Sequence, residues 1–275
     1  TLASLEIYGL TRTLFTMLFG WGSLFWFYGG AHGDTWSLMH VTAVLGLTLA
    51  IYDVVGNGRG WLAGIGFGFA VLARQPVLLS LPFFVGILWR DDAQGANRNL
   101  NREIRFAACF AALMILEAYY NAARFGSPFD NGYKRALFGV PMPWGMFSVR
   151  YVPQNAATYF LKLPNKLQGF PWFDPTIDGF SVFIATPALF LAIAADYRKR
   201  INLLALSACI GIQAFYLTYF STGNEQFGAR YTIDYLPLVN LLAADGFKNR
   251  SVKWLALATL LGLLIEVWGI IWWRY

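Results

Sequence analysis

Long apolar stretches, separated by short polar connections, limit most strongly what this chain can fold into. Hydrophobic residues make up 57% of the 275 residues and charged residues 13%, against about 25% charged residues in soluble domains. A helix needs about 20 apolar residues to cross a bilayer. The sequence therefore predicts an all-α integral membrane protein with about nine transmembrane helices. The candidate spans are 8–28, 38–55, 61–73, 77–89, 106–123, 180–196, 201–220, 232–247 and 254–272.

The third and fourth candidate spans are short, and the run Arg74-Gln75-Pro76 lies between them. Proline breaks the hydrogen-bond ladder of a helix, so this region could be one kinked helix or two short helices. The connections 57–60 and 90–105 are both basic, and short basic connections favour the cytoplasm. Only a hairpin places both on one side. We therefore expect the chain to reverse within 73–77, with Arg74 at the external face.

The distribution of Lys and Arg orients the other spans. The segments 197–200 and 248–253 are basic, whereas 29–37 and 221–229 contain no Lys or Arg. The rule that basic connections stay inside then predicts a cytoplasmic N-terminus, in a prokaryotic inner or plasma membrane. Basic connections near lipid phosphates also account for the net charge of +6. We expect membrane lipids, and no nucleic acid, as partners.

One sizeable segment lies outside the predicted spans. Residues 125–179 mix basic and aromatic residues too finely for a linker, and they predict an external loop with interfacial segments or a cap over a cavity. The predicted organisation is a first transmembrane bundle at 1–124, this loop, and a second bundle at 180–275.

Polar and turn-forming residues gather in 119–133, directly after an apolar run. Irregular backbone of this kind is not tolerated against lipid, so the stretch indicates the mouth of the bundle. Arg124 lies in it, and Arg74 and Arg230 lie at the ends of other spans on the same predicted face. Three such cations could form one anion site, because a guanidinium matches phosphate oxygens. They could also be interfacial anchors that extend to the headgroups.

Carboxylates near or inside the apolar runs are the next candidates. Asp34, beside His32 and before His40, could be a general base or bind a divalent metal ion. Its position also suits a plain N-cap of the following helix, which is the better interpretation. Two histidines without a third ligand are a weak signal for a metal site, so a divalent metal ion is a candidate cofactor and no cofactor is firmly predicted. Glu117 and Glu266 lie within spans, where carboxylates are functional candidates or are paired internally.

Other familiar signatures are missing from the sequence. There is no Walker loop, dinucleotide fingerprint, nucleophile elbow or zinc-protease motif. Cys109 and Cys209 both lie inside apolar runs, so we expect packed thiols rather than a disulfide. The chain starts at Thr1, and we expect it to be part of a longer protein.

Several short runs occur in a suggestive order. They are Leu-Ala-Arg-Gln-Pro at 72–76, Asn-x-x-Arg-Phe-Gly-Ser-Pro at 121–128 and Phe-Gly-x-Arg-Tyr at 227–231. In these runs and their spacing the chain resembles the polytopic GT-C glycosyltransferases, of the protein O-mannosyltransferase and lipid A aminoarabinose transferase kind. The resemblance covers most of the chain.

The resemblance implies transfer of a sugar from a polyprenyl-phosphate donor on the external face. It also implies a catalytic Asp or Glu in the first external loop, and we expect that carboxylate to lie upstream of this chain. Asp34 is then only a weak catalytic candidate. Carried onto this sequence, Arg74, Arg124 and Arg230 would hold the lipid phosphate. Sugar or acceptor contacts would come from Asn121, Asp130, Tyr133, Gln226 and Tyr231, and aromatic stacking from Tyr133, Trp144 and Trp172.

A second interpretation is a non-catalytic accessory subunit of a larger membrane complex, which has the fold without the chemistry. An Asp or Glu in a loop after one further N-terminal span would favour the enzyme. A transporter is a weaker third alternative, because the sequence shows no paired halves with broken helices beyond 61–89.

Overall fold

The computed structural model describes residues 9–89, 100–248 and 250–274. These residues form helices almost throughout. The α-helices are α1 (Gly9–Gly20), α2 (Leu24–Trp26), α3 (Thr35–Tyr52), α4 (Trp61–Ala73), α5 (Leu81–Leu88), α6 (Leu100–Phe125), α7 (Tyr133–Ala136), α8 (Val152–Ala156), α9 (Val182–Ala185), α10 (Ala188–Ala192), α11 (Arg200–Thr218), α12 (Leu236–Phe247) and α13 (Val252–Arg274).

Shorter elements join them. The π-helical turns are Phe27–Ala31, Asp53–Asn57 and Ala157–Leu161, and the 3₁₀ helices are Gln75–Ser80, Val149–Tyr151 and Arg230–Tyr235. Strands β1 (Asn165–Lys166) and β2 (Phe173–Asp174) pair antiparallel.

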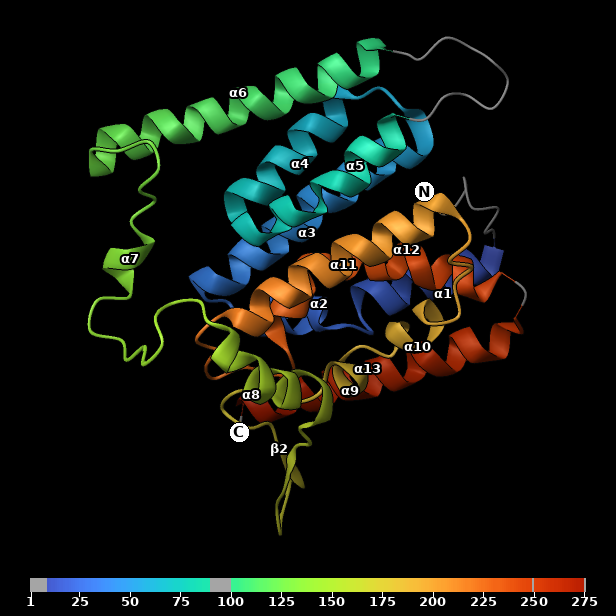
Figure 1. Cartoon of the computed structure of the whole chain (residues 1–275). Coiled ribbons are helices and arrows are strands. Elements are labelled where there is room, and N and C mark those ends of the chain that lie inside the picture. Colours follow the sequence, from blue (N-terminus) through green and yellow to red (C-terminus); the bar gives the residue numbers. More distant parts are fainter. Residues whose placement is uncertain (1–8, 90–99, 249, 275) are drawn as a thin grey trace.

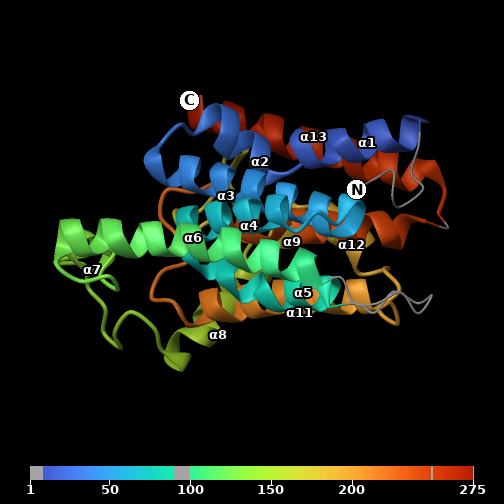
Figure 2. The same ribbon diagram turned by 90° about the horizontal axis from the view of Figure 1, so that it is seen from above.

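The long helices run roughly side by side in two groups (Figures 1 and 2). In the first group α4 lies between α3 and α6. In the second, α12 packs on α10 and α11, and α13 packs on α1. Helix α11 joins the groups through its contacts with α5.

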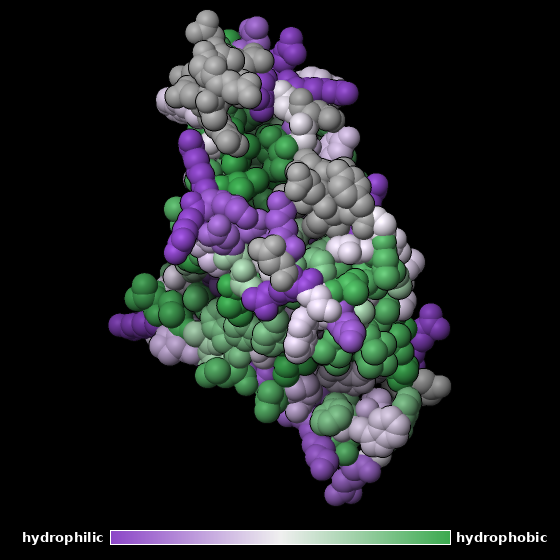
Figure 3. Space-filling model, turned by 90° about the vertical axis from the view of Figure 1, so that its right-hand side faces the viewer, coloured by the Kyte–Doolittle hydropathy of each residue, from purple (hydrophilic) through white to green (hydrophobic). Residues whose placement is uncertain are grey.

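One end of the bundle collects the basic connections. Helices α4, α6, α11 and α13 all begin there, so the described basic segments 100–105, 197–200 and 250–253 lie at this end, here called the basic end (Figures 1 and 2). Figure 3 looks toward it and shows hydrophilic groups among broad hydrophobic surface. The opposite end, where α4 and α11 end, is called the loop end. This separation agrees with the predicted placement of 197–200 and of the described parts of 90–105 and 248–253; residues 90–99 and 249 lie outside the described residues.

Membrane-helix character is present, but nine spans are not confirmed. Among the described residues, four helices are long and apolar enough to cross a membrane, at Thr35–Gly56, Leu100–Phe125, Arg200–Thr218 and Val252–Arg274. The predicted span 8–28 is interrupted after Gly20, and 180–196 divides into α9 and α10 around Pro187. The predicted span 232–247 starts as a 3₁₀ helix and continues as α12, which is buried along almost its whole length. Turn-forming residues inside apolar runs shorten these helices.

The expected chain reversal is present. Helix α4 ends at Ala73, Arg74 is extended, and a 3₁₀ helix starts at Gln75. Phe67 of α4 then packs on Phe84 of α5, with ring centroids 4.7 Å apart. The two short helices therefore form a hairpin rather than one kinked helix (Figure 1).

The predicted loop 125–179 is partly folded and is tied to the end of α11. Buried Asn155 donates hydrogen bonds from Nδ2 to the carbonyls of Leu217 (2.9 Å) and Tyr219 (2.7 Å). The Ser148 amide donates to the Thr218 carbonyl at 2.8 Å. These bonds satisfy carbonyls that the end of a helix leaves free. The segment is therefore an ordered part of the loop end.

Both cysteines are free thiols, as expected. Cys209 is buried in α11 and Cys109 is half-buried in α6.

Asp53 fixes the turn between α3 and α4. Its carboxylate is buried and accepts the amides of Arg59 (3.1 Å), Gly60 (2.8 Å) and Ala63 (3.1 Å). These include amides at the start of α4 that would otherwise lack acceptors.

We expect Asp53→Ala to lower the free energy of unfolding by about 2 kcal/mol, the upper range for losing a helix cap. Thermal unfolding of the purified protein in detergent, followed by circular dichroism, measures this loss. Asp34→Ala is the comparison. Among the described residues the Asp34 carboxylate accepts one backbone amide, that of Ser37, against three for Asp53, so the loss of stability should be smaller. Equal losses would contradict the role of Asp53.

Candidate functional site

A buried carboxylate, Asp234, is the centre of a group of polar side chains inside the bundle. His40 Nδ1 lies 2.5 Å from Asp234 Oδ1, and Arg74 Nε donates to Oδ2 at 3.0 Å. The Tyr216 hydroxyl also donates to Oδ2 and accepts from Arg74 Nη2 at 2.9 Å. These four residues are called the Asp234 cluster. The carboxylate is inaccessible to solvent and is fully paired.

Helix ends bring the cluster together just inside the loop end. Arg74 follows α4, and its extended backbone leaves the helix just before Pro76. Asp234 lies in the 3₁₀ helix that precedes α12, and His40 and Tyr216 come from α3 and α11. The end of α4, the start of α12 and the sides of α3 and α11 thus bring these side chains together in the interior of the bundle.

Arg74 lies near the loop end, where the predicted reversal places it. Its side chain is largely buried and its charge is compensated by Asp234, a partner that neither the phosphate interpretation nor the anchor interpretation includes. The sequence analysis does not identify this partner, because Asp234 lies inside the predicted span 232–247. An acidic residue inside an apolar run needs a partner or a function, and that rule would have marked Asp234 as a candidate.

Arg230 lies beside the cluster and is less well compensated. It is buried, and its guanidinium carbon lies 5.6 Å from the centre of the Tyr231 ring, which also has Arg74 at 5.3 Å. Tyr231 stacks on Tyr216 at 4.6 Å. In the part of the chain that the structure describes, Arg230 Nε has no hydrogen-bond partner and Arg230 forms no ion pair. Two of the three predicted arginines therefore converge on one aromatic ring.

His40 leaves a second nitrogen open. Because Nδ1 faces a carboxylate, this nitrogen carries the proton, and in the neutral ring Nε2 is then an acceptor. Nε2 is buried and lacks a partner among the described residues. The His40 ring lies 5.9 Å from Tyr231. Buried polar atoms are rarely left without a partner, so the unpaired nitrogens of His40 and Arg230, which lie beside one ring, are the two atoms here that a polar ligand group would satisfy.

Arg124 does not join this group. It lies at the exposed end of α6, which projects beyond α4 and α11 (Figures 1 and 2). Its guanidinium packs on Phe125 at 5.1 Å and donates to the Tyr120 hydroxyl. Arg124 therefore lies apart from Arg74 and Arg230. Its contacts are Tyr120, one turn earlier in α6, and the adjacent Phe125, an arrangement compatible with the alternative of an interfacial anchor.

The predicted sugar or acceptor residues are dispersed. Asn121 is buried and donates to the Pro128 carbonyl at 3.4 Å, and Asp130 pairs with Arg135 at 3.1 Å. Gln226 is buried and donates to the carbonyls of Asp178 and Thr222. These three side chains hold loops together, and no hydrogen bond or ion pair among the described residues joins them to the Asp234 cluster.

Tyr133 and Tyr231 are closer together. The Tyr133 and Tyr219 hydroxyls are 2.5 Å apart, and the Tyr219 ring lies 6.1 Å from Tyr231. A row of tyrosines therefore leads from α7 to Tyr231. The other two aromatic residues predicted to stack on sugar lie elsewhere. Trp144 packs on Tyr151 at 5.0 Å, and Trp172 lies in the β1–β2 hairpin.

Asp34 is the N-cap of α3, as the better interpretation predicted. Its Oδ1 accepts the Ser37 amide at 2.6 Å, and His32 Nδ1 lies 3.4 Å from it. Partial burial opposes its ionisation, but hydrogen bonds from Ser37 and the charges of His32 and Arg230 hold its pKa below the usual range. A carboxylate with a lowered pKa is a weak general base near neutral pH. Across the described residues, no three His, Cys, Asp or Glu side chains are grouped as metal ligands.

The two carboxylates within helices differ. Glu117 of α6 lies 3.5 Å from Gln75 Nε2 near the surface. Glu266 of α13 is fully buried and its Oε2 accepts the Phe27 amide at 3.1 Å. Glu266 thus binds the backbone where the first apolar run turns into a π-helical turn, a structural role.

Comparison with known proteins adds no relative: no family model, curated protein or solved structure matches this chain. The site must therefore be interpreted from its own geometry.

Proposed function

We propose that this chain binds the phosphate of a polyprenyl-phosphate-linked sugar at Arg230, as the donor site of a GT-C-like membrane glycosyltransferase. The observation that carries the proposal is the buried guanidinium of Arg230, whose Nε has no partner among the described residues. A buried charge is costly unless it is paired and hydrogen-bonded.

The charges of the site favour a singly charged anion. Among the buried groups, Arg74 and Arg230 contribute two positive charges and Asp234 one negative charge, which leaves one positive charge with His40 neutral. The carboxylate of Asp34 also interacts with Arg230, but it is partly exposed, so solvent screens its charge. A phosphodiester that links a lipid to a sugar carries one negative charge. The planar guanidinium fork of Arg230 suits two phosphate oxygens.

The surroundings of Arg230 suit a sugar beside that phosphate. The Tyr231 ring offers an apolar face, and His40 Nε2 offers an acceptor for a sugar hydroxyl. The hydroxyls of Tyr133 and Tyr219 lie along the same row of rings. Arg74 then acts by holding Asp234 and Tyr231 in place rather than as the phosphate ligand.

The orientation follows from the same proposal. The loop end would face outward and the basic end the cytoplasm of a prokaryotic inner membrane, because basic connections stay inside. The donor would then be used on the external face.

Binding of polyprenyl-phosphomannose to the purified chain in detergent tests the proposal. We expect Arg230→Gln to raise the Kd by about tenfold or more, because a desolvated charge pair loses one partner. Arg124→Gln is the matched control, since Arg124 lies outside the site, and its Kd should change by less than about twofold. Equal affinities of wild type and Arg230→Gln would contradict the proposal.

A non-catalytic accessory subunit is the second candidate. It is favoured because neither nearby carboxylate is free to act as a general base: Asp234 is fully paired, and Asp34 caps a helix. Release of polyprenyl phosphate from the bound donor in the presence of an acceptor alcohol distinguishes the two. Donor binding without any release would favour the subunit.

A further inference from the structure

The β1–β2 hairpin carries an unusual apolar tip. Asn165 pairs with Asp174 and Lys166 with Phe173, and the turn between the strands contains Phe170 and Trp172. These two side chains are 55% and 61% exposed. The hairpin projects away from the helices beside α13 (Figure 1).

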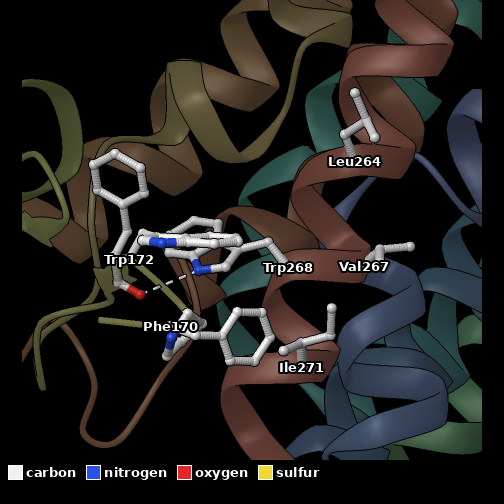
Figure 4. A pocket seen from close by; sticks show the side chains of 8 residues that line it. Phe170, Trp172, Leu264, Val267, Trp268 and Ile271 are labelled. Atoms are coloured by element: carbon white, nitrogen blue, oxygen red, sulfur yellow. Dashed lines mark hydrogen bonds between the residues drawn. The ribbon is translucent and has the colours of Figure 1, made fainter. Parts of the chain in front are cut away.

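The hairpin and α13 line an open groove. Its volume is about 270 Å³, and Figure 4 shows Phe170, Trp172 and Trp268 gathered on one side and aliphatic side chains of α13 on the other. Trp268 Nε1 donates to the Phe173 carbonyl at 3.2 Å, and Trp272 Nε1 donates to Asp174 at 2.8 Å. These bonds hold the hairpin against α13, and they satisfy the N–H group of each indole ring. The groove is lined by Phe170, Pro171, Trp172, Phe173, Leu264, Val267, Trp268 and Ile271.

The groove continues an exposed apolar stripe along α13. This helix is one of the four that can cross a membrane. Exposed leucines and a valine recur every three or four residues along it, which places them on one face. Leu264 and Val267 belong to this stripe and also line the groove. Because the stripe and the groove share these two residues, a molecule that packs on the stripe also contacts the groove. The stripe consists of Leu257, Leu260, Leu261, Leu264 and Val267.

The turn holds Trp172 outward. Trp172 has φ +65°, which residues other than glycine seldom adopt. Its amide donates to the Gly169 carbonyl at 2.7 Å, and its carbonyl accepts the Leu167 amide at 2.8 Å. Sparsely populated backbone conformations cluster where a ligand is held. A large aromatic side chain kept exposed in this way needs an apolar partner.

We propose that the hairpin tip and α13 bind one acyl chain of a membrane phospholipid. If α13 crosses a membrane, as its length and apolar composition allow, hydrocarbon covers the stripe, and the acyl chain extends from that surface into the groove. The volume falls just below the ~300–1,000 Å³ typical of pockets for drug-sized ligands, which suits a single chain. Lys166, exposed on β1, supplies a positive charge for the lipid phosphate. This site is independent of the one at Arg230.

Spin labelling tests where the tip lies. In a Cys109→Ala and Cys209→Ala background, a nitroxide at Phe170→Cys is examined in phosphatidylcholine–phosphatidylglycerol vesicles. We expect collisions with oxygen, which partitions into hydrocarbon, to exceed those with a water-soluble nickel complex. Asn224→Cys, exposed in a polar loop, is the control and should show the reverse. A nickel-accessible Phe170 label, or one that neither reagent reaches, would overturn the proposal.

Brominated lipids test the occupant with the native cysteines in place. Phosphatidylcholine with brominated acyl chains should quench the tryptophan fluorescence of the wild type, and Trp172→Phe should lose part of that quenching. Unchanged quenching would overturn the site. Relief of the Trp172-dependent quenching by equimolar polyprenyl phosphate would assign the groove to a prenyl tail instead, which also overturns it. Neither outcome depends on Arg230. A failed quenching test would therefore rule out the acyl-chain site without bearing on donor binding at Arg230.

Discussion

Asp234→Ala should lower the free energy of unfolding by about 3–5 kcal/mol, the cost of leaving one partner of a buried ion pair alone. The substitution strands the guanidinium of Arg74 and removes the acceptor of the Tyr216 hydroxyl. His40 loses its partner as well. Thermal unfolding in detergent, followed by circular dichroism, gives the measurement.

Two further variants separate this cause from a general effect of losing an acid. Asp130→Ala removes a partner of Arg135 in a solvent-exposed pair and should cost no more than about 1 kcal/mol. Replacing both charges, with Arg74→Met and Asp234→Leu, should cost less than Asp234→Ala alone, because no buried charge is left unpaired. An Asp234→Ala loss as small as that of Asp130→Ala would show that the cluster does not stabilise the bundle.

Gly66→Leu should lower the free energy of unfolding by about 3 kcal/mol or more. This is at or above the upper end of the usual cost of overpacking a core. Helices α3 and α4 touch through their backbones: a Cβ on Gly66 would lie 2.6 Å from the Gly46 carbonyl oxygen, and one on Gly46 would lie 2.5 Å from that of Gly66. Backbone cannot move aside as a flexible side chain can, so the helices would have to separate. Since α4 carries Arg74, the separation would also disturb the Asp234 cluster.

The same unfolding assay measures the effect, with Gly33→Leu as the control. A Cβ on Gly33 meets no atom within 4 Å, and this glycine is exposed. Gly33→Leu should therefore stay within about 0.5 kcal/mol of wild type. A Gly66→Leu protein as stable as the control would contradict the close approach of α3 and α4.

Features set by local sequence could be predicted. Apolar length identified α6, α11 and α13, the charge of the two flanking connections identified the reversal after Ala73, and a side-chain acceptor before a helix identified Asp34 as a cap. Charge placement identified the basic end. Each of these depends on residues close together in the chain, so short-range rules suffice.

The partners inside the bundle could not be predicted in the same way. His40 and Arg74 meet Asp234 across 194 and 160 residues, and apolar periodicity does not specify which distant helix ends come together. Apolar content likewise did not reveal that 232–247 is an interior element rather than a lipid-facing span. Arg124 lies apart from Arg74 for a related reason: a shared face of the membrane does not imply a shared site.

The most direct test of the account is a structure of this chain in a lipid nanodisc with polyprenyl-phosphomannose, determined by electron cryomicroscopy. The account predicts density for the phosphate within hydrogen-bond distance of the Arg230 guanidinium, beside the Tyr231 ring, with the Arg74–Asp234 pair intact. Phosphate density at Arg124 or at another surface of the bundle, with the Arg230 side chain free of it, would contradict the account.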